Sequence, residues 1–178
     1  GVIKYYKMAD VLLINRDDIM KLTGVGGNVD EDKFYPHIKT AQDIHLQPVI
    51  GTDLLNKLLT IVGDGTWDDA GNEDYSYLIT TFLTPLLVFY TMVDLLPFQL
   101  YQIQNGGIYR HTSDNSIVAE ENEMKMMVAD FRSKAEFYVR RANDYIANNT
   151  SKFPEYSSNS GDDMSPDSGT GNFVQWVI

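Results

Sequence analysis

The chain contains no cysteine, which excludes disulfide bonds and thiolate chemistry. Basic residues are scarce: 14 lysines and arginines stand against 25 aspartates and glutamates, so the formal net charge is −11 at pH 7. Because affinity for nucleic acid comes mainly from lysine and arginine contacts with phosphates, this balance argues against a protein that binds DNA or RNA. The acidity favours a protein that repels DNA or that is kept soluble by its charge.

Signatures of catalysis, cofactor binding and metal binding are also missing. The glycine-rich stretch 24–27 lacks the Lys-Ser/Thr pair that completes a phosphate-binding loop, and no Gly-x-Ser-x-Gly motif occurs. The three histidines, His37, His45 and His111, form no metal-ligand pair, and a His37 acid/base pair with Asp43 or His45 is supported only by nearness in sequence. We therefore expect no catalytic residue, no metal and no cofactor, and we predict that the protein is not an enzyme.

Two acidic stretches need a separate interpretation. Asn28, Asp30 and Asp32 alternate as at the start of a calcium-binding loop, but the sixth position is Lys33, where that loop requires glycine. Helix capping explains these residues better. The stretch 63–72 is rich in aspartate and glycine, but its spacing matches no calcium motif, so we interpret it as a solvated loop.

Apolar residues make up 43% of the chain, which is enough for a core, and over most of its length they recur at intervals of three and four. This spacing is typical of amphipathic helices packed in a bundle. We expect Asn15, Asp30 and Thr52 to cap the helices that follow them. The expected helices cover residues 16–22, 31–44, 53–62, 73–104 and 117–149.

Several stretches modify this pattern. Residues 46–51 are expected to break the chain between the second and third helices, and Pro85 and Pro97 are expected to bend or split the fourth. Residues 108–112 favour a short strand. In the last helix, the methionine cluster at 124–127 is expected to fill the core rather than to contact a partner.

The fourth helix carries no charged residue from position 75 to 93, which approaches the length of a membrane span. It also contains threonines, tyrosines and Pro85, and no positive charge flanks it. These features favour a buried core helix over a membrane-spanning one.

The C-terminal part is a Ser/Gly/Asp/Asn-rich stretch, 157–172, followed by the run Phe-Val-Gln-Trp-Val-Ile. An apolar end on a polar tether requires something to cover it, and its β-branched and aromatic residues favour a strand. The run can fold back on the body and pair with residues 108–109, it can add to a neighbouring chain as a strand, or it can stay disordered. The expected interface residues are Ile108, Tyr109, Phe173, Val174, Trp176, Val177 and Ile178.

Together these observations predict an all-α protein, a helical bundle of about four to five helices with a short β element and an extended C-terminal tail. The predicted division is a helical domain at 1–153 and a flexible tail at 154–178 that ends in a short strand.

Five stretches of the sequence, taken in order, carry a resemblance to a known family. They are VLLINRDDIMKLT at 11–23, FYPHIKTAQDIHLQPVIG at 34–51, TDLL at 52–55, NGGIY at 105–109 and FPEY at 153–156. In this order they resemble the head–tail connector, or head completion, proteins of tailed bacteriophages, and more narrowly the neck ring proteins of crAss-like phages that infect Bacteroides. The most distinctive part is Lys-Thr-Ala-Gln at 39–42 followed by Pro-Val-Ile-Gly at 48–51.

The resemblance implies a structural virion protein that assembles as a ring, usually of twelve copies, below the portal and extends the DNA channel toward the tail. Its expected partners are copies of itself, the portal protein and other neck or tail ring proteins. DNA would pass without specific binding, and no membrane is involved. The implied location is the neck of the virion, at the head–tail junction, after assembly in the cytoplasm of the host bacterium.

A different class of function fits the same features. The chain can be a soluble helical adaptor of a bacterial cell that binds a partner through its C-terminal strand. Ring formation, or association with a portal protein, separates the two readings.

Overall fold

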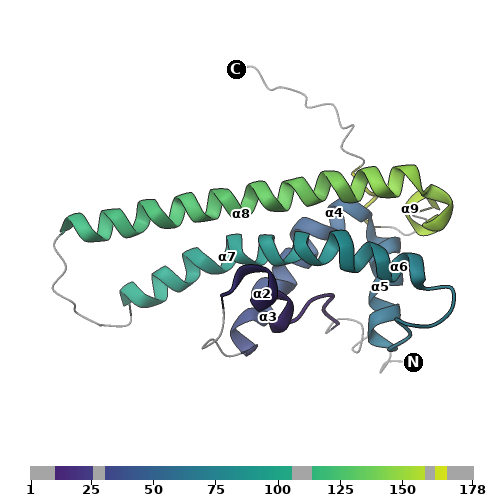
Figure 1. Cartoon of the computed structure of the whole chain (residues 1–178), viewed down its shortest axis with the longest axis horizontal. Coiled ribbons are helices and arrows are strands. Elements are labelled where there is room, and N and C mark those ends of the chain that lie inside the picture. Colours follow the sequence, from purple (N-terminus) through teal and green to yellow (C-terminus); the bar gives the residue numbers. More distant parts are fainter. Residues whose placement is uncertain (1–10, 26–30, 106–113, 159–162, 168–178) are drawn as a thin grey trace, which may run out of the picture.

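The computed structural model describes residues 11–25, 31–105, 114–158 and 163–167, and all secondary structure in these ranges is helical (Figure 1). The expected all-α class is therefore confirmed, whereas the strand expected at 108–112 lies outside the described residues. The elements are α2 (Arg16–Thr23), α3 (Glu31–Thr40), η1 (Ala41–Leu46), α4 (Gln47–Ile50), α5 (Thr52–Gly63), α6 (Glu73–Leu78), η2 (Ile79–Leu83), α7 (Thr84–Asn105), α8 (Asp114–Asn148), η3 (Thr150–Lys152) and α9 (Pro154–Ser158).

Helices α7 and α8 run side by side along the longest dimension of the molecule, and α2 and α3 pack on α7 (Figure 1). The helix Glu73–Gln99 is the one helix of the described residues that is long and apolar enough to cross a membrane, but 78% of its most apolar window is buried inside the fold. Leu86, Leu87 and Val88 are all fully buried, as expected of the central helix of a bundle.

Two wide turns of π-helix, η1 and η2, interrupt the longer helices. In η1 the backbone N–H of Gln47 donates to the carbonyl of Gln42, and in η2 that of Thr84 donates to Ile79, five residues back in each case. A proline follows each turn, Pro48 and Pro85 respectively. Because proline has no N–H and its ring clashes with the carbonyl four residues earlier, a wider turn lets the helix continue past it.

The break expected at 46–51 occurs at its last residue, and of the bend or split expected at Pro85 and Pro97 only the split is excluded. Helix continues from Glu31 through η1 to Ile50, and the chain turns only at Gly51, whose φ of 79° is a conformation that favours glycine. Helix also continues from Glu73 to Asn105, so neither proline within it splits it.

The packing of α8 on α7 depends on small residues. Ala135 and Ala142 are fully buried and allow the two helices to approach closely, and Ile146 is fully buried near the end of α8. Met126 is 73% exposed and Met127 is also exposed, so the expectation that these methionines fill the core was wrong. Met124, the third methionine of the cluster, is half-buried, and Met126, two positions later, points about 160° away from it and so faces solvent.

Candidate functional site

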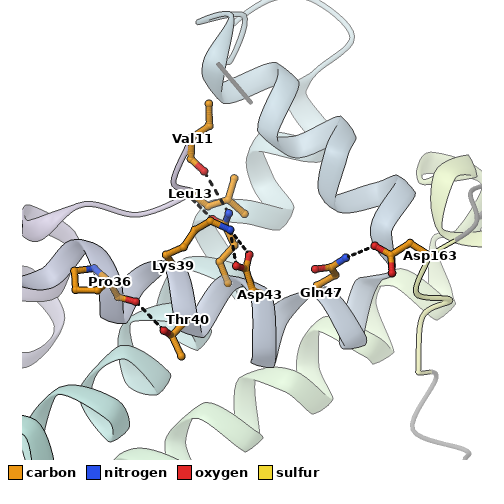
Figure 2. A network of polar contacts seen from close by, with 9 residues as sticks. Val11, Leu13, Pro36, Lys39, Thr40, Asp43, Gln47 and Asp163 are labelled. Carbon is orange, nitrogen blue, oxygen red and sulfur yellow. Dashed lines mark hydrogen bonds and ion pairs between the residues drawn. The ribbon is translucent and has the colours of Figure 1, made fainter. Parts of the chain in front are cut away.

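Gln42, in η1, joins the extended segment that precedes α2 to the helices. Its Oε1 accepts a hydrogen bond from the backbone N–H of Leu13 at 3.1 Å, and its Nε2 donates to the carbonyl of Val11 at 3.3 Å (Figure 2). The side chain is only 1% exposed. Since a buried amide is stable only when its polar atoms are paired, these two bonds fix the segment against the helix.

The segment 163–167 lies on the turn between α4 and α5. The backbone N–H of Thr52 donates to the carbonyl of Met164 at 3.0 Å, and the N–H of Asp167 donates to the carbonyl of Pro48 at 2.7 Å. The side chain of Gln47 donates from Nε2 to Asp163 Oδ2 at 3.1 Å (Figure 2). The segment thus satisfies a backbone donor that the start of α5 would otherwise leave without a partner.

Thr52 does not have the role that its position predicts. The N-cap of α5 is Gly51, and no side chain caps this helix. Thr52 Oγ1 instead accepts hydrogen bonds from Gln47 Nε2 at 2.8 Å and from the backbone N–H of Met164 at 3.1 Å. The expected cap was wrong because a partner distant in sequence uses the hydroxyl. By contrast, Asn15 caps α2 as expected, in a reciprocal pair of hydrogen bonds with Asp18.

The side chains of Gln42, Gln47 and Thr52, with the carbonyl of Pro48, are called the terminal anchor below. Its members hold both extended segments of the described chain, one near each end of the sequence. Their shared role was not predicted from the sequence. Gln42 lies four residues after the buried Ile38 and four before the buried Leu46, so a polar residue within an apolar stripe was the available signal.

Two further polar contacts of this helix are local. Lys39 pairs with Asp43 one turn later, and the hydroxyl of Thr40 donates to the carbonyl of Pro36 at 2.8 Å (Figure 2). The ion pair is half-exposed, and exposed pairs of this spacing contribute little to stability. These contacts support the helix but join it to no other segment.

Part of the expected C-terminal tail is packed against the body. Phe153 is fully buried, with ring centroids 5.5 Å from Tyr75 and 5.9 Å from Tyr145. In α9, Glu155 accepts a hydrogen bond of 2.8 Å from the hydroxyl of Tyr75. Burial, and then this hydrogen bond, raise the pKa of Tyr75 well above its ordinary value. Both α9 and the segment 163–167, which follow the predicted boundary at residue 153, thus form hydrogen bonds with the helical body. The division itself stays a prediction.

The structure gives His37 a partner that the sequence did not suggest. Its Nδ1 lies 2.5 Å from Asp94 Oδ2, across the contact between α3 and α7, and its ring packs against Phe98 with centroids 5.1 Å apart. Nε2 is buried and has no hydrogen-bond partner among the described residues. With one nitrogen on Asp94 and the other shielded from solvent, the imidazole is suited to joining two helices rather than to proton transfer with a substrate.

Asp43 and His45 were the two acid/base partners considered for His37. Among the described residues, neither forms a hydrogen bond with it. Asp43 binds Lys39, and His45 stacks on Tyr90 with ring centroids 3.9 Å apart. Burial, and then the positive charge of Arg132, lower the pKa of His45, and Asp94 partly opposes this effect. The third histidine, His111, lies outside the described residues, as does Asp30.

Within the described ranges, no group of three or more histidine, aspartate or glutamate side chains is placed to hold a metal ion. The loop between α5 and α6 is ordered by its own hydrogen bonds: Asn72 Nδ2 donates to the carbonyl of Thr66 at 2.8 Å, and Ser76 Oγ donates to that of Trp67 at 2.7 Å. It therefore has a defined shape and presents its aspartates to solvent.

The interface residues expected from the sequence all fall outside the part of the chain that the structure describes. They are Ile108, Tyr109, Phe173, Val174, Trp176, Val177 and Ile178. Their pairing, in one chain or between chains, stays a prediction.

Comparison with known proteins gives one match. A family model matches residues 46–163, which is more than half of the chain, and the family is described as one of unknown function, DUF6712. No curated protein and no solved structure matches the chain. The matched range includes Gln47 and Thr52 of the terminal anchor, both long helices and α9. The chain therefore belongs to DUF6712, a family of unknown function.

Proposed function

We propose that this protein is a structural virion protein, a subunit of a ring in the neck of a tailed phage that joins the portal to the tail and extends the DNA channel. The observation that carries the proposal is the terminal anchor. Gln42 lies in the Lys-Thr-Ala-Gln stretch and Pro48 begins the Pro-Val-Ile-Gly stretch, the two stretches on which the resemblance to connector proteins depends most.

An anchor of this kind suits a subunit that assembles with neighbours. Such a subunit needs a rigid body and needs extended segments that leave it from fixed points. Here the segments at Val11 and at Asp167 are both hydrogen-bonded to the helix that ends at Ile50. Val11 and Asp167 are thus held at defined positions on the body.

The charge of the chain supports the same role. A net charge of −11 would prevent DNA from adhering to a channel wall, because phosphates are repelled by carboxylates. In this proposal the protein acts by assembly and carries out no reaction, so no cofactor is required.

Electron microscopy of negatively stained protein, alone and mixed with the purified portal protein of the same phage, tests the proposal. We expect closed rings, or particles bound to the portal, and no retention on DNA-cellulose at physiological salt. A chain that stays monomeric or dimeric and does not bind the portal would instead favour the cellular adaptor.

Deletion of residues 173–178 tests the part of the proposal that concerns the C-terminal strand. We expect unchanged helix content by circular dichroism but weaker association in sedimentation experiments, because the proposal gives these residues a role between chains and not within the helical body. Unchanged association would remove the strand from the assembly mechanism.

A further inference from the structure

Arg141, on the exposed side of α8, lies among three aromatic rings. The carbon of its guanidinium is 5.0 Å from the ring centroid of Phe82, 5.6 Å from that of Tyr138 and 5.8 Å from that of Phe137. These distances are those of cation–π contacts. None of the ion pairs among the described residues involves Arg141. Its charge is thus held in place by rings and is available to a carboxylate.

The same side of the molecule carries further aromatic and basic groups. Phe137 is 48% exposed, and Tyr77, whose ring contacts that of Phe82, is also exposed. Two turns earlier on α8, Lys134 lies 5.4 Å from the ring centroid of Phe131, and its ammonium is paired with Asp130, so among the described residues Arg141 carries the unpaired positive charge of this surface. Tyr77, Phe131, Lys134, Phe137 and Arg141 are called the α8 ridge below. Exposed aromatic residues around an arginine are typical of the centre of a protein–protein interface.

The opposite charge lies on the loop between α5 and α6. Asp64, Asp68 and Asp69 are exposed, and none of them takes part in an ion pair of the described residues. Because the hydrogen bonds of Asn72 and Ser76 order this loop, its carboxylates are presented in a fixed arrangement. Ordering before association lowers the entropy that binding would lose.

We propose that the α8 ridge binds the acidic loop 64–72 of a second copy of this chain, with Arg141 as the central contact. A guanidinium surrounded by aromatic rings can still bind a carboxylate through two parallel N–H···O hydrogen bonds. Two copies that each carry a charge of −11 repel one another in most orientations, and pairing ridge with loop brings opposite charges together.

The contact uses two different surfaces, so it leaves a free ridge on one copy and a free loop on the other. Such head-to-tail contacts propagate into closed rings or open filaments rather than stopping at a dimer. The inference rests on the proposed ring and names the surfaces that would form it.

Charge reversal with a matched control tests the contact. We expect Arg141→Glu to weaken self-association of the full chain by about tenfold or more in sedimentation equilibrium, because a central charge pair becomes repulsive. Arg140→Glu changes the net charge equally but lies about 100° around the helix, and it has no aromatic contact among the described residues. The Arg140 variant should associate like the unaltered protein, and circular dichroism should show that both variants are folded.

A mixing experiment supplies the decisive result. A chain with Asp68→Lys and Asp69→Lys should not associate with itself, but it should bind the Arg141→Glu chain, because the loop of the first now matches the ridge of the second. Equal effects of the two arginine variants, or no binding in the mixture, would overturn the inference. If the unaltered chain then still formed rings, the proposed function would stand. An unaltered chain that remains monomeric at its highest soluble concentration would overturn the inference as well, and the portal experiment would decide the function separately.

Discussion

Replacing Gln42 by leucine should destabilise the protein through one backbone group. Leucine has nearly the volume of glutamine but neither accepts from Leu13 nor donates to Val11, whose bonds to Gln42 are 3.1 and 3.3 Å long. Leu13 is buried, so its N–H would lose its partner away from water, which costs about 1–3 kcal/mol. The carbonyl of Val11 belongs to a half-buried residue and can be hydrated, so it adds little. We expect the free energy of unfolding to fall by about 1–3 kcal/mol.

Urea unfolding and thermal melting measure this change. For a domain of this size each kcal/mol lowers the melting temperature by roughly 2–4 °C. Thr40→Val is the matched control, because the Thr40 hydroxyl donates to the carbonyl of Pro36 at an exposed position of the same helix. The control should change stability by less than about 0.5 kcal/mol. Hydrogen exchange at the Leu13 amide should accelerate in the Gln42 variant alone. Equal shifts in the two variants, with Leu13 still protected, would falsify the assigned role of Gln42.

Three further changes test the packing, the anchor and the pH dependence. Phe153→Ala should lower the free energy of unfolding by about 3–5 kcal/mol, and Phe131→Ala by less, because Phe153 is fully buried and Phe131 only half-buried; equal urea midpoints would contradict this difference. Thr52→Val should release the segment 163–167, seen as faster hydrogen exchange at its amides with little change in the melting temperature. His45 has a lowered pKa in the folded protein, so the unfolded chain binds the proton more readily, and stability should decrease as the pH falls below about 6.5. His45→Phe should keep the stacking on Tyr90 but lose that dependence, as urea titrations at several pH values would show.

The sequence predicted those parts of the fold that local chemistry decides. The positions of the long helices follow from the spacing of apolar residues. The cap of α2 was predicted because Asn15 directly precedes that helix, and the groups it bonds to lie only three residues away, on Asp18. The role of Thr52 was missed because its hydroxyl bonds to Met164, which is 112 residues away. No pattern near Thr52 could show that contact, so a helix cap was the natural prediction.

The site was less predictable than the fold for the same reason. Gln42 acts through backbone groups 29 and 31 residues away, and Phe153 is buried by rings from other helices. A proline after Phe153 predicted only where the helix ends. Arg141 was expected to lie in an amphipathic helix, but the rings around it come partly from η2, and periodicity on α8 cannot indicate which side chains of another helix it will meet.

The π turn η1 is related to three features of this helix: its continuation past Pro48, the placement of Gln42 and Gln47, and the exposure of Ile44. It lets helix continue to Pro48, and its hydrogen bond from Gln47 to Gln42 sets these residues one turn apart. In a regular α-helix, residues five positions apart point about 140° away from each other, so the wide turn changes how the two glutamines of the anchor are placed. The turn also contains one more residue than an α-helical turn, and Ile44, within it, is 61% exposed. The exposure of this apolar residue thus follows from the backbone geometry that the proline and the anchor require, and it does not by itself indicate a binding surface.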